Sequence, residues 1–236
     1  MNKFITPSIL VVIIVFGAWY GSLYFAKPLA ENNPPSIEEI ATSTPEETPP
    51  LAEVKPTEDP LQVKALAIVR SPLVIKKTLP ESTLRLAKEK IAEAVSLIET
   101  SYDYDAPWLE LGGYRRLLGD YDGAAAAWKF LIEIRPQAFV PYHNLGDLYA
   151  FILKDHVRGE NYFLKSLEVG PGNIQGYLAL AQLYKDSTTL KKQVLADDIL
   201  LEGVKINPKD FTLLYALGEY YRDNGDKDSA LKYFED

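Results

Sequence analysis

A unit of roughly 35 residues recurs four times in the second half of this 236-residue chain, and that repetition constrains the fold more than any other feature. Each unit begins near a leucine that is followed by a small residue, and the first three units close on a proline. The leucine pairs are Leu111-Gly112, Leu145-Gly146, Leu180-Ala181 and Leu217-Gly218, and the closing prolines are Pro136, Pro171 and Pro208.

The remaining positions of the unit alternate large and small side chains at helical spacing. Large residues stand three positions before each leucine and, except for Arg115 in the first unit, aromatic ones four positions after it: Trp108, Tyr142, Tyr177 and Leu214, then Arg115, Tyr149, Tyr184 and Tyr221. The second half of each unit has a small residue followed four positions later by a bulky one: Ala124–Trp128, Gly159–Phe163, Ala196–Leu200 and Ala230–Phe234. Spacings of three and four residues place these side chains on one face of a helix, so each unit is predicted to be two helices.

This pattern resembles the tetratricopeptide repeat, a 34-residue helix–turn–helix unit with W-x2-L-G-x2-Y, A-x3-F and P positions. The resemblance implies an all-α fold, an α-solenoid of repeats at 105–138, 139–172, 173–210 and 211–236, the last incomplete. Arg115 departs from the pattern by replacing a tyrosine. The second and third repeats are also longer between their helices, by one and three residues.

Each glycine inside a helix lowers its stability by roughly 0.5–1 kcal/mol relative to alanine. In a tetratricopeptide unit the two helices pack antiparallel, so Gly112, Gly146, Ala181 and Gly218 are expected to permit close contact that offsets this cost. Gly113 lies one position further on and is expected to face the groove. There the glycine either leaves room for a ligand backbone, or it has no role and the helix tolerates the loss of stability.

The resemblance also implies a concave groove lined by the first helix of each repeat, suited to an extended or helical peptide. The partner-binding residues predicted from it are Leu109, Arg116, His143, Asp147, Leu178, Gln182, Lys185, Tyr215, Glu219 and Arg222. For His143 and Tyr215, ordinary packing or surface exposure is the alternative. Some family members clamp a C-terminal carboxylate, but only Asn144 matches a clamp position, so that mode of capture is not expected.

Two acidic turns superficially resemble calcium loops. GDYDG (Gly119–Gly123) and DNGDKD (Asp223–Asp228) lack the spacing of calcium ligands and coincide with the turn between the helices of a repeat. Glycine and aspartate are expected there as a C-cap and an N-cap. His156 falls in the longer turn of the second repeat and is expected to be solvated.

Residues 61–104 are predicted to be a connecting segment and a leading helix that packs on the array. Residues 61–80 fit either a short strand or a short helix, because Pro72 and Pro80 break any long helix. Thr78 and Glu81 have the spacing of a capping box for the next helix, with Ser82 as an alternative cap. One face of that helix is expected to carry Leu84, Ala87, Ile91, Ala94 and Ile98.

The N-terminal region, 1–30, is predicted to be a transmembrane anchor. The segment from Ser8 to Ala26 has no charged residue and is long enough to span the hydrocarbon core as a helix. A cleaved signal peptide is the alternative, but its apolar core is usually shorter, and no small-x-small cleavage site follows. Lys3 and the amino terminus favour an orientation with the N-terminus inside. The expectation is therefore a single-pass protein of the bacterial plasma membrane with its repeats on the extracytoplasmic side.

Residues 31–60 join the anchor to the remainder. They contain eight acidic residues and one lysine, with many prolines, glutamates and threonines and little to bury. This composition predicts an extended, disordered acidic linker that acts as a spacer.

Composition excludes several function classes. The chain has no cysteine and only two histidines, and no nucleophile–base pair, metal cluster or phosphate loop is apparent, so no cofactor is expected and an enzyme is disfavoured. Residues 61–236 hold 22 basic and 25 acidic residues, which gives no basic face for nucleic acid. We expect a membrane-tethered scaffold for protein–protein interaction that binds a peptide of a protein partner, in envelope assembly, secretion or chaperoning. The alternatives are a regulatory fragment with an effector domain beyond residue 236, or an enzyme.

The last repeat raises one more possibility. No capping helix follows its second helix within the sequence, so apolar surface around Leu231 and Phe234 is expected to be exposed. Either further chain or self-association with a second copy would cover it.

Overall fold

The computed structural model describes residues 59–235, and within that range it contains helices and no strand. The helices are α1 (Pro60–Val69), α2 (Glu81–Thr100), α3 (Asp105–Leu118), α4 (Tyr121–Ile134), α5 (Phe139–Asp147), α6 (His156–Val169), α7 (Ile174–Asp186), α8 (Ala196–Ile206), α9 (Phe211–Asp223) and α10 (Lys227–Glu235). A short π-helix, η2 (Leu148–Ile152), continues α5, and a 3-10 turn, η3 (Gln193–Leu195), precedes α8.

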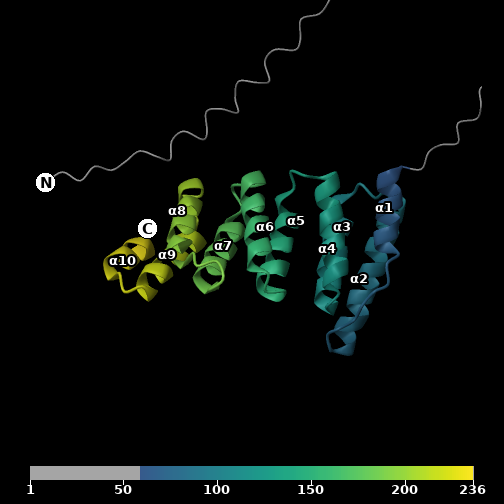
Figure 1. Cartoon of the computed structure of the whole chain (residues 1–236), viewed down its shortest axis with the longest axis horizontal. Coiled ribbons are helices and arrows are strands. Elements are labelled where there is room, and N and C mark those ends of the chain that lie inside the picture. The colour runs from purple at the N-terminus through teal and green to yellow at the C-terminus, as the bar shows by residue number, and fades with distance from the viewer. Residues whose placement is uncertain (1–58, 236) are drawn as a thin grey trace, which may run out of the picture. The chain divides into compact units, whose positions relative to one another are not determined.

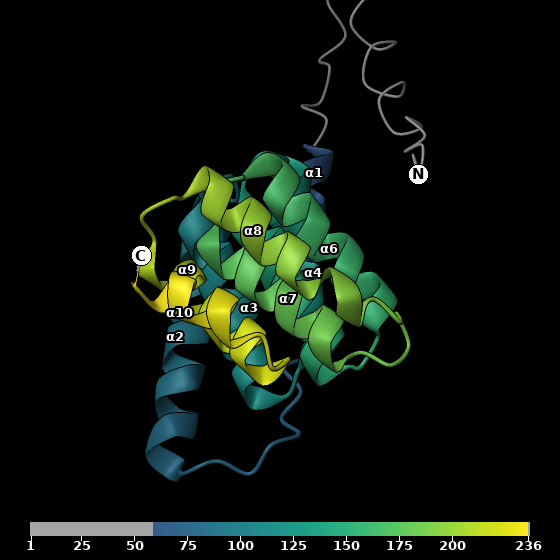
Figure 2. The ribbon, with the colours of Figure 1, turned by 90° about the vertical axis from the view of Figure 1, so that its left-hand side faces the viewer.

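Four antiparallel hairpins follow one another along this part of the chain: α3–α4, α5–α6, α7–α8 and α9–α10 (Figure 1). Viewed from the end that carries α9 and α10, the hairpins lie one behind another (Figure 2). The predicted all-α helical repeat is therefore confirmed for the described residues.

Small residues allow the two helices of each hairpin to approach, as predicted, and the structure shows what each one contacts. A Cβ atom on Gly112 would overlap the indole of Trp128, and a Cβ on Gly146 would lie 2.5 Å from Cδ1 of Phe163. At Gly112 and Gly146 the close contact is thus between a helix backbone and an aromatic ring of the partner helix, whereas Gly159 of α6 lies against the backbone of Ala150. Each bulky residue of the second helix fills the space that the missing side chain leaves.

The two acidic turns are caps, as predicted. Gly119 has a φ of 85° and ends α3, and the side chain of Asp120 accepts a hydrogen bond from the Gly123 amide at the start of α4. In the fourth hairpin Gly225 has a φ of 82°, and Asp226 accepts from the Ser229 amide. Glycine adopts this left-handed conformation without the steric penalty that other residues incur.

The insertions in the second and third repeats are absorbed locally. The extra residue of the second repeat widens the end of the first helix into η2, where the Leu153 amide donates to the Leu148 carbonyl. Single π-turns of this kind accommodate one additional residue without breaking the helix. The longer connection of the third repeat runs through η3 and is held by Gln193, which donates to the Ser187 carbonyl over 2.9 Å.

The segment before the repeats contains two helices, α1 and α2. Of the two alternatives for residues 61–80, the helix is correct: α1 has Asp59 as its N-cap and Pro60 in its first turn, so the helix begins at the last residue assigned to the linker. The predicted capping box of α2 is wrong, because Pro80 is the N-cap and no side chain caps this end. Proline disfavours helical geometry at the residue before it, so the helix cannot begin at Leu79 as a Thr78 cap requires.

The predicted face of α2 is confirmed. Ala87, Ile91, Ala94 and Ile98 are buried, and Leu84 is partly buried against the same core, which includes Trp108 and Leu111 of α3. The two helices before the repeats therefore extend the hydrophobic core of the first hairpin.

The predicted anchor at residues 8–26 and the acidic linker up to residue 58 lie outside the described residues. Between residues 59 and 235, none of the helices has both the length and the apolar character needed to cross a membrane.

Candidate functional site: the face of the first helices

The first helices of successive hairpins bring half of the predicted partner-binding residues to one hollow. This hollow, hereafter the α7–α9 pocket, has a volume of about 330 Å³. Its lining includes five of the predicted residues: Leu178, Gln182, Lys185, Tyr215 and Glu219. The other lining residues are Ala181, Ala196, Leu200, Ala216, Tyr220 and Asp223.

The interior of the α7–α9 pocket is apolar because helices of two hairpins converge there. Ala196 and Leu200 of α8 line the interior of the pocket, and both are buried. Leu178 of α7 is half-buried, and Tyr215 of α9 is 47% exposed. The pocket therefore presents apolar surface that is accessible to a ligand.

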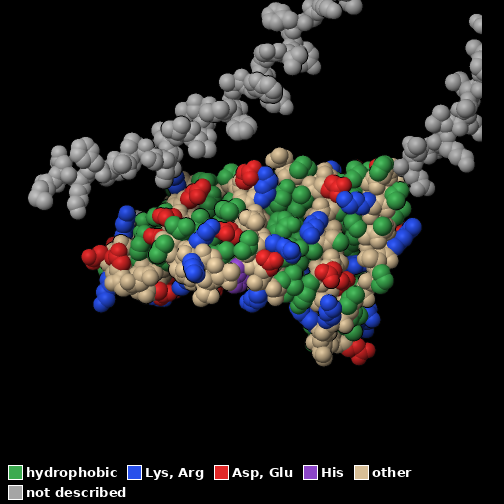
Figure 3. All heavy atoms as spheres, viewed as in Figure 1, with side chains coloured by type: hydrophobic (Ala, Val, Ile, Leu, Met, Phe, Trp, Pro, Cys, Tyr) green, Lys and Arg blue, Asp and Glu red, His purple; other side chains and the backbone are tan. Residues whose placement is uncertain are grey.

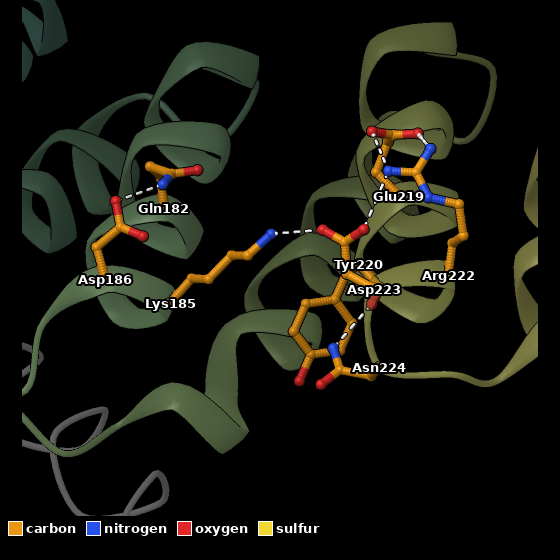
Figure 4. Close-up of polar contacts among 8 residues, drawn as sticks. All are labelled: Gln182, Lys185, Asp186, Glu219, Tyr220, Arg222, Asp223 and Asn224. Carbon is orange, nitrogen blue, oxygen red and sulfur yellow. Dashed lines mark hydrogen bonds and ion pairs between the residues drawn. The ribbon is translucent and has the colours of Figure 1, made fainter.

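Charged side chains form the rim of this pocket (Figure 4). Lys185 Nζ lies 2.8 Å from Asp223 Oδ2, an ion pair that joins α7 of the third hairpin to α9 of the fourth. Arg222 contacts Glu219 and lies 3.0 Å from Asp223 Oδ1, so it belongs to the rim although it does not line the pocket. Gln182 donates to Asp186 one turn later on α7.

Hydrogen bonds favour the ionised form of Asp223 in this rim. The hydrogen bond from Lys185, followed by that from Arg222, lowers the pKa of Asp223 below its usual value. Burial, together with Asp197 and Asp198 of α8, raises the pKa of the Tyr220 phenol. Asp223 is thus a carboxylate and Tyr220 a neutral phenol under physiological conditions.

The four remaining predicted residues lie on α3 and α5, away from the α7–α9 pocket. Arg116 Nη1 is 3.8 Å from Asp147 Oδ2, a contact that joins the first and second hairpins. Leu109 is half-buried and packs against the cores of both. The His143 ring lies 5.5 Å from the ring of Phe163, centroid to centroid, which favours the packing alternative for this residue.

Burial changes the pKa of His143 more than the charges of Asp147 and Arg116 do. Desolvation lowers the pKa of His143, the Asp147 carboxylate opposes that shift, and Arg116 adds to it. The imidazole is therefore biased towards its neutral form.

The sequence prediction missed several residues of the pocket, and it misplaced one histidine. Tyr220 and Asp223 were not predicted, although Asp223 follows Glu219 by four positions and so shares its helix face. His156 was expected to be solvated, but it is half-buried at the start of α6, and its Nδ1 lies 2.7 Å from Ser187 Oγ. Ser187 is the C-cap of α7 in the next hairpin.

Within residues 59–235, no group of three histidine, aspartate or glutamate side chains is placed to hold a metal ion. On the face seen in Figure 3, acidic and basic side chains are interspersed with hydrophobic ones.

Comparison with known proteins identifies a tetratricopeptide repeat in the last part of the chain. The family model described as tetratricopeptide repeat matches residues 211–236. The crystal structure of MamA has a TM-score of 0.50 to this chain at 16% identity, covering 68% of this chain and 93% of MamA. YrrB, described as a TPR protein with an unusual peptide-binding site, has a TM-score of 0.48 at 20% identity, covering 60% of this chain and 71% of YrrB.

Among curated proteins, the general transcriptional corepressor trfA of Dictyostelium discoideum is 27% identical over 127 residues. The alignment covers 54% of this chain but only 9% of trfA, so it concerns a small part of that protein.

Proposed function

We propose, from the premise that this chain is a helical-hairpin repeat protein with a tetratricopeptide repeat at residues 211–236, that it is a scaffold for protein–protein interaction. The face formed by α3, α5, α7 and α9 binds a peptide segment of a protein partner. The observation that carries the proposal is the α7–α9 pocket, which combines an apolar interior with a charged rim on that face. Such a combination suits a peptide that has both apolar anchors and charges.

In-cell photocrosslinking of the full chain tests this proposal. A photoreactive residue replaces Leu178 or Tyr215 on the proposed binding face, and the matched control replaces Val157, which is exposed on α6, a second helix. The proposal expects a discrete protein adduct from Leu178 and Tyr215 and none from Val157. Adducts from Val157 alone, or from no position, contradict it.

The scaffold is tethered to a membrane through residues 8–26, with the repeats on the extracytoplasmic side of a bacterial plasma membrane and a role in envelope assembly, secretion or chaperoning. The support is in the sequence: an uncharged apolar segment is followed by an acidic linker. Membrane fractionation, followed by protease treatment of spheroplasts, checks both parts. Recovery of the full chain in the soluble fraction contradicts the tether, and protection of the repeats from protease contradicts the orientation.

The fourth hairpin also supports a proposal of self-association. Phe234 is 40% exposed, whereas Trp128, Phe163 and Leu200, at the matching positions of the other hairpins, are at most 4% exposed. In those hairpins the next repeat supplies the cover. Phe211, which is 75% exposed, adds to this aromatic surface, and a second copy can cover it.

A further inference from the structure

The composition of the α7–α9 pocket specifies more than the binding of a peptide. We infer that this pocket takes one large apolar side chain of the partner peptide, and that a lysine or arginine next to that side chain pairs with the acidic rim. This inference rests on the proposed peptide binding and adds the chemistry of the ligand.

The size of the pocket fits a single side chain. Ligand pockets commonly span about 300–1,000 Å³, and the volume here, about 330 Å³, is at the lower end. Three alanines create the space, Ala181 on α7, Ala196 on α8 and Ala216 on α9, while Leu178 and Leu200 supply apolar surface. Covering that surface with an aliphatic or aromatic side chain is favourable in proportion to the apolar area removed from water.

The charge around the pocket favours a basic neighbour to the anchor. The lining of the pocket has two carboxylates, Glu219 and Asp223, and one cation, Lys185; Arg222, outside the lining, pairs with both carboxylates. Behind Tyr220, α8 adds Asp197 and Asp198, both close enough to raise the pKa of its phenol. With Asp197 and Asp198 included, the charge around the pocket is net negative.

The existing ion pairs do not prevent a ligand from using these carboxylates. The side chains of Lys185 and Asp223 are 46% and 40% exposed, and a solvent-exposed pair of this kind contributes little to stability. A lysine or arginine of the peptide can therefore share or replace Lys185 at Asp223 at little cost. Glu219 lies one turn away on the same face of α9 and offers a second carboxylate.

Fluorescence anisotropy with four matched peptides tests the inference on the full chain in detergent micelles. Each dye-labelled 12-residue peptide has the same glycine–serine background; the central residue is leucine or alanine, flanked by arginines or by glutamates. The leucine–arginine peptide is expected to bind at least about tenfold more tightly than the other three, since buried anchors dominate such interfaces. Equal or tighter binding of the leucine–glutamate or alanine–arginine peptide, or no binding of the leucine–arginine peptide, overturns the inference.

Two variants locate the preference in the α7–α9 pocket. Glu219→Lys is expected to lower the affinity for the leucine–arginine peptide by at least about tenfold. It is also expected to reduce the difference in affinity between that peptide and the leucine–glutamate peptide. Glu202→Lys, an identical change at an exposed position of α8 that does not line the pocket, is expected to leave the order unchanged. Similar effects of the two variants overturn the inference. If photocrosslinking at Leu178 succeeds while these peptides show no preference, peptide binding by this face stands and only its assigned chemistry fails.

Discussion

The guanidinium of Arg115 and the carboxylate of Asp120 form an ion pair of 3.0 Å at the end of α3, with side chains only 2% and 5% exposed. Arg115 also donates to the hydroxyl and the carbonyl of Ser71. The amides of Lys76 and Lys77 donate to the Leu118 carbonyl nearby. The arginine that departs from the repeat pattern therefore ties the segment between α1 and α2 onto the first hairpin.

Asp120→Ala is predicted to lower the free energy of unfolding by about 3–5 kcal/mol, because it leaves the buried guanidinium of Arg115 without its counter-charge. The matched control is Asp226→Ala, which removes the corresponding N-cap of α10 at an exposed site without a buried arginine. The Asp226→Ala control is expected to lower the free energy of unfolding by about 1 kcal/mol. Chemical denaturation measures both, and equal losses contradict the role of the ion pair.

Stability is predicted to fall as the pH drops from about 7 to 5, in part through His143. Burial lowers the pKa of His143 in the folded state, so the unfolded chain binds more protons at this site below its ordinary pKa of about 6.5. The contribution of His143 is thus present above that pKa and is lost as the pH falls through the folded value. His143→Gln is expected to flatten the dependence of Tm on pH over this range, whereas an unchanged slope contradicts the assignment.

Lys185→Ala is predicted to change the free energy of unfolding by less than about 1 kcal/mol, although it removes a contact between two hairpins. The pair with Asp223 is exposed, so its Coulomb energy is largely offset by solvation and side-chain entropy. Urea denaturation measures the change. A loss above about 2 kcal/mol contradicts the view that this pair is free to exchange with a ligand.

Phe211→Glu is predicted to abolish self-association, because it places a charge on the exposed aromatic surface of the last hairpin. Analytical ultracentrifugation of the full chain in detergent is expected to show a dimer or larger species for the parent and a monomer for the variant. Leu153→Glu, at an exposed leucine that follows η2, is the control and is expected to associate as the parent does. A monomeric parent at high concentration contradicts the proposal.

The repeats could be predicted from sequence because their signal is local and occurs four times. A small residue in the first helix and a bulky one in the second recur in all four units, and the first three hairpins bury both. The caps at Asp120 and Asp226 were also predictable, since an N-cap interacts with an amide only a few residues away.

Features that depend on distant contacts could not be predicted. Nothing near Arg115 in the sequence indicates Ser71, which is brought to it only when the segment before α2 folds back over α3. The α7–α9 pocket is assembled from side chains of three helices, α7, α8 and α9, so Ala216 and Tyr220 gave no signal of their own. The start of α2 was missed for a local reason, because the restriction that Pro80 imposes outweighs the capping spacing of Thr78.

The central claim is that a glycine or alanine at one position of each first helix allows the hairpins to form, and two adjacent glycines test it directly. A Cβ on Gly112 would overlap the Trp128 ring, whereas a Cβ on Gly113 would meet nothing within 4 Å. Thermal melting of the two alanine variants, followed by circular dichroism at 222 nm, is the decisive measurement. Gly113→Ala is expected to raise Tm by about 1–4 °C through its helix propensity, and Gly112→Ala to lower Tm through overpacking. A Gly112→Ala variant that melts at or above the parent would contradict the account.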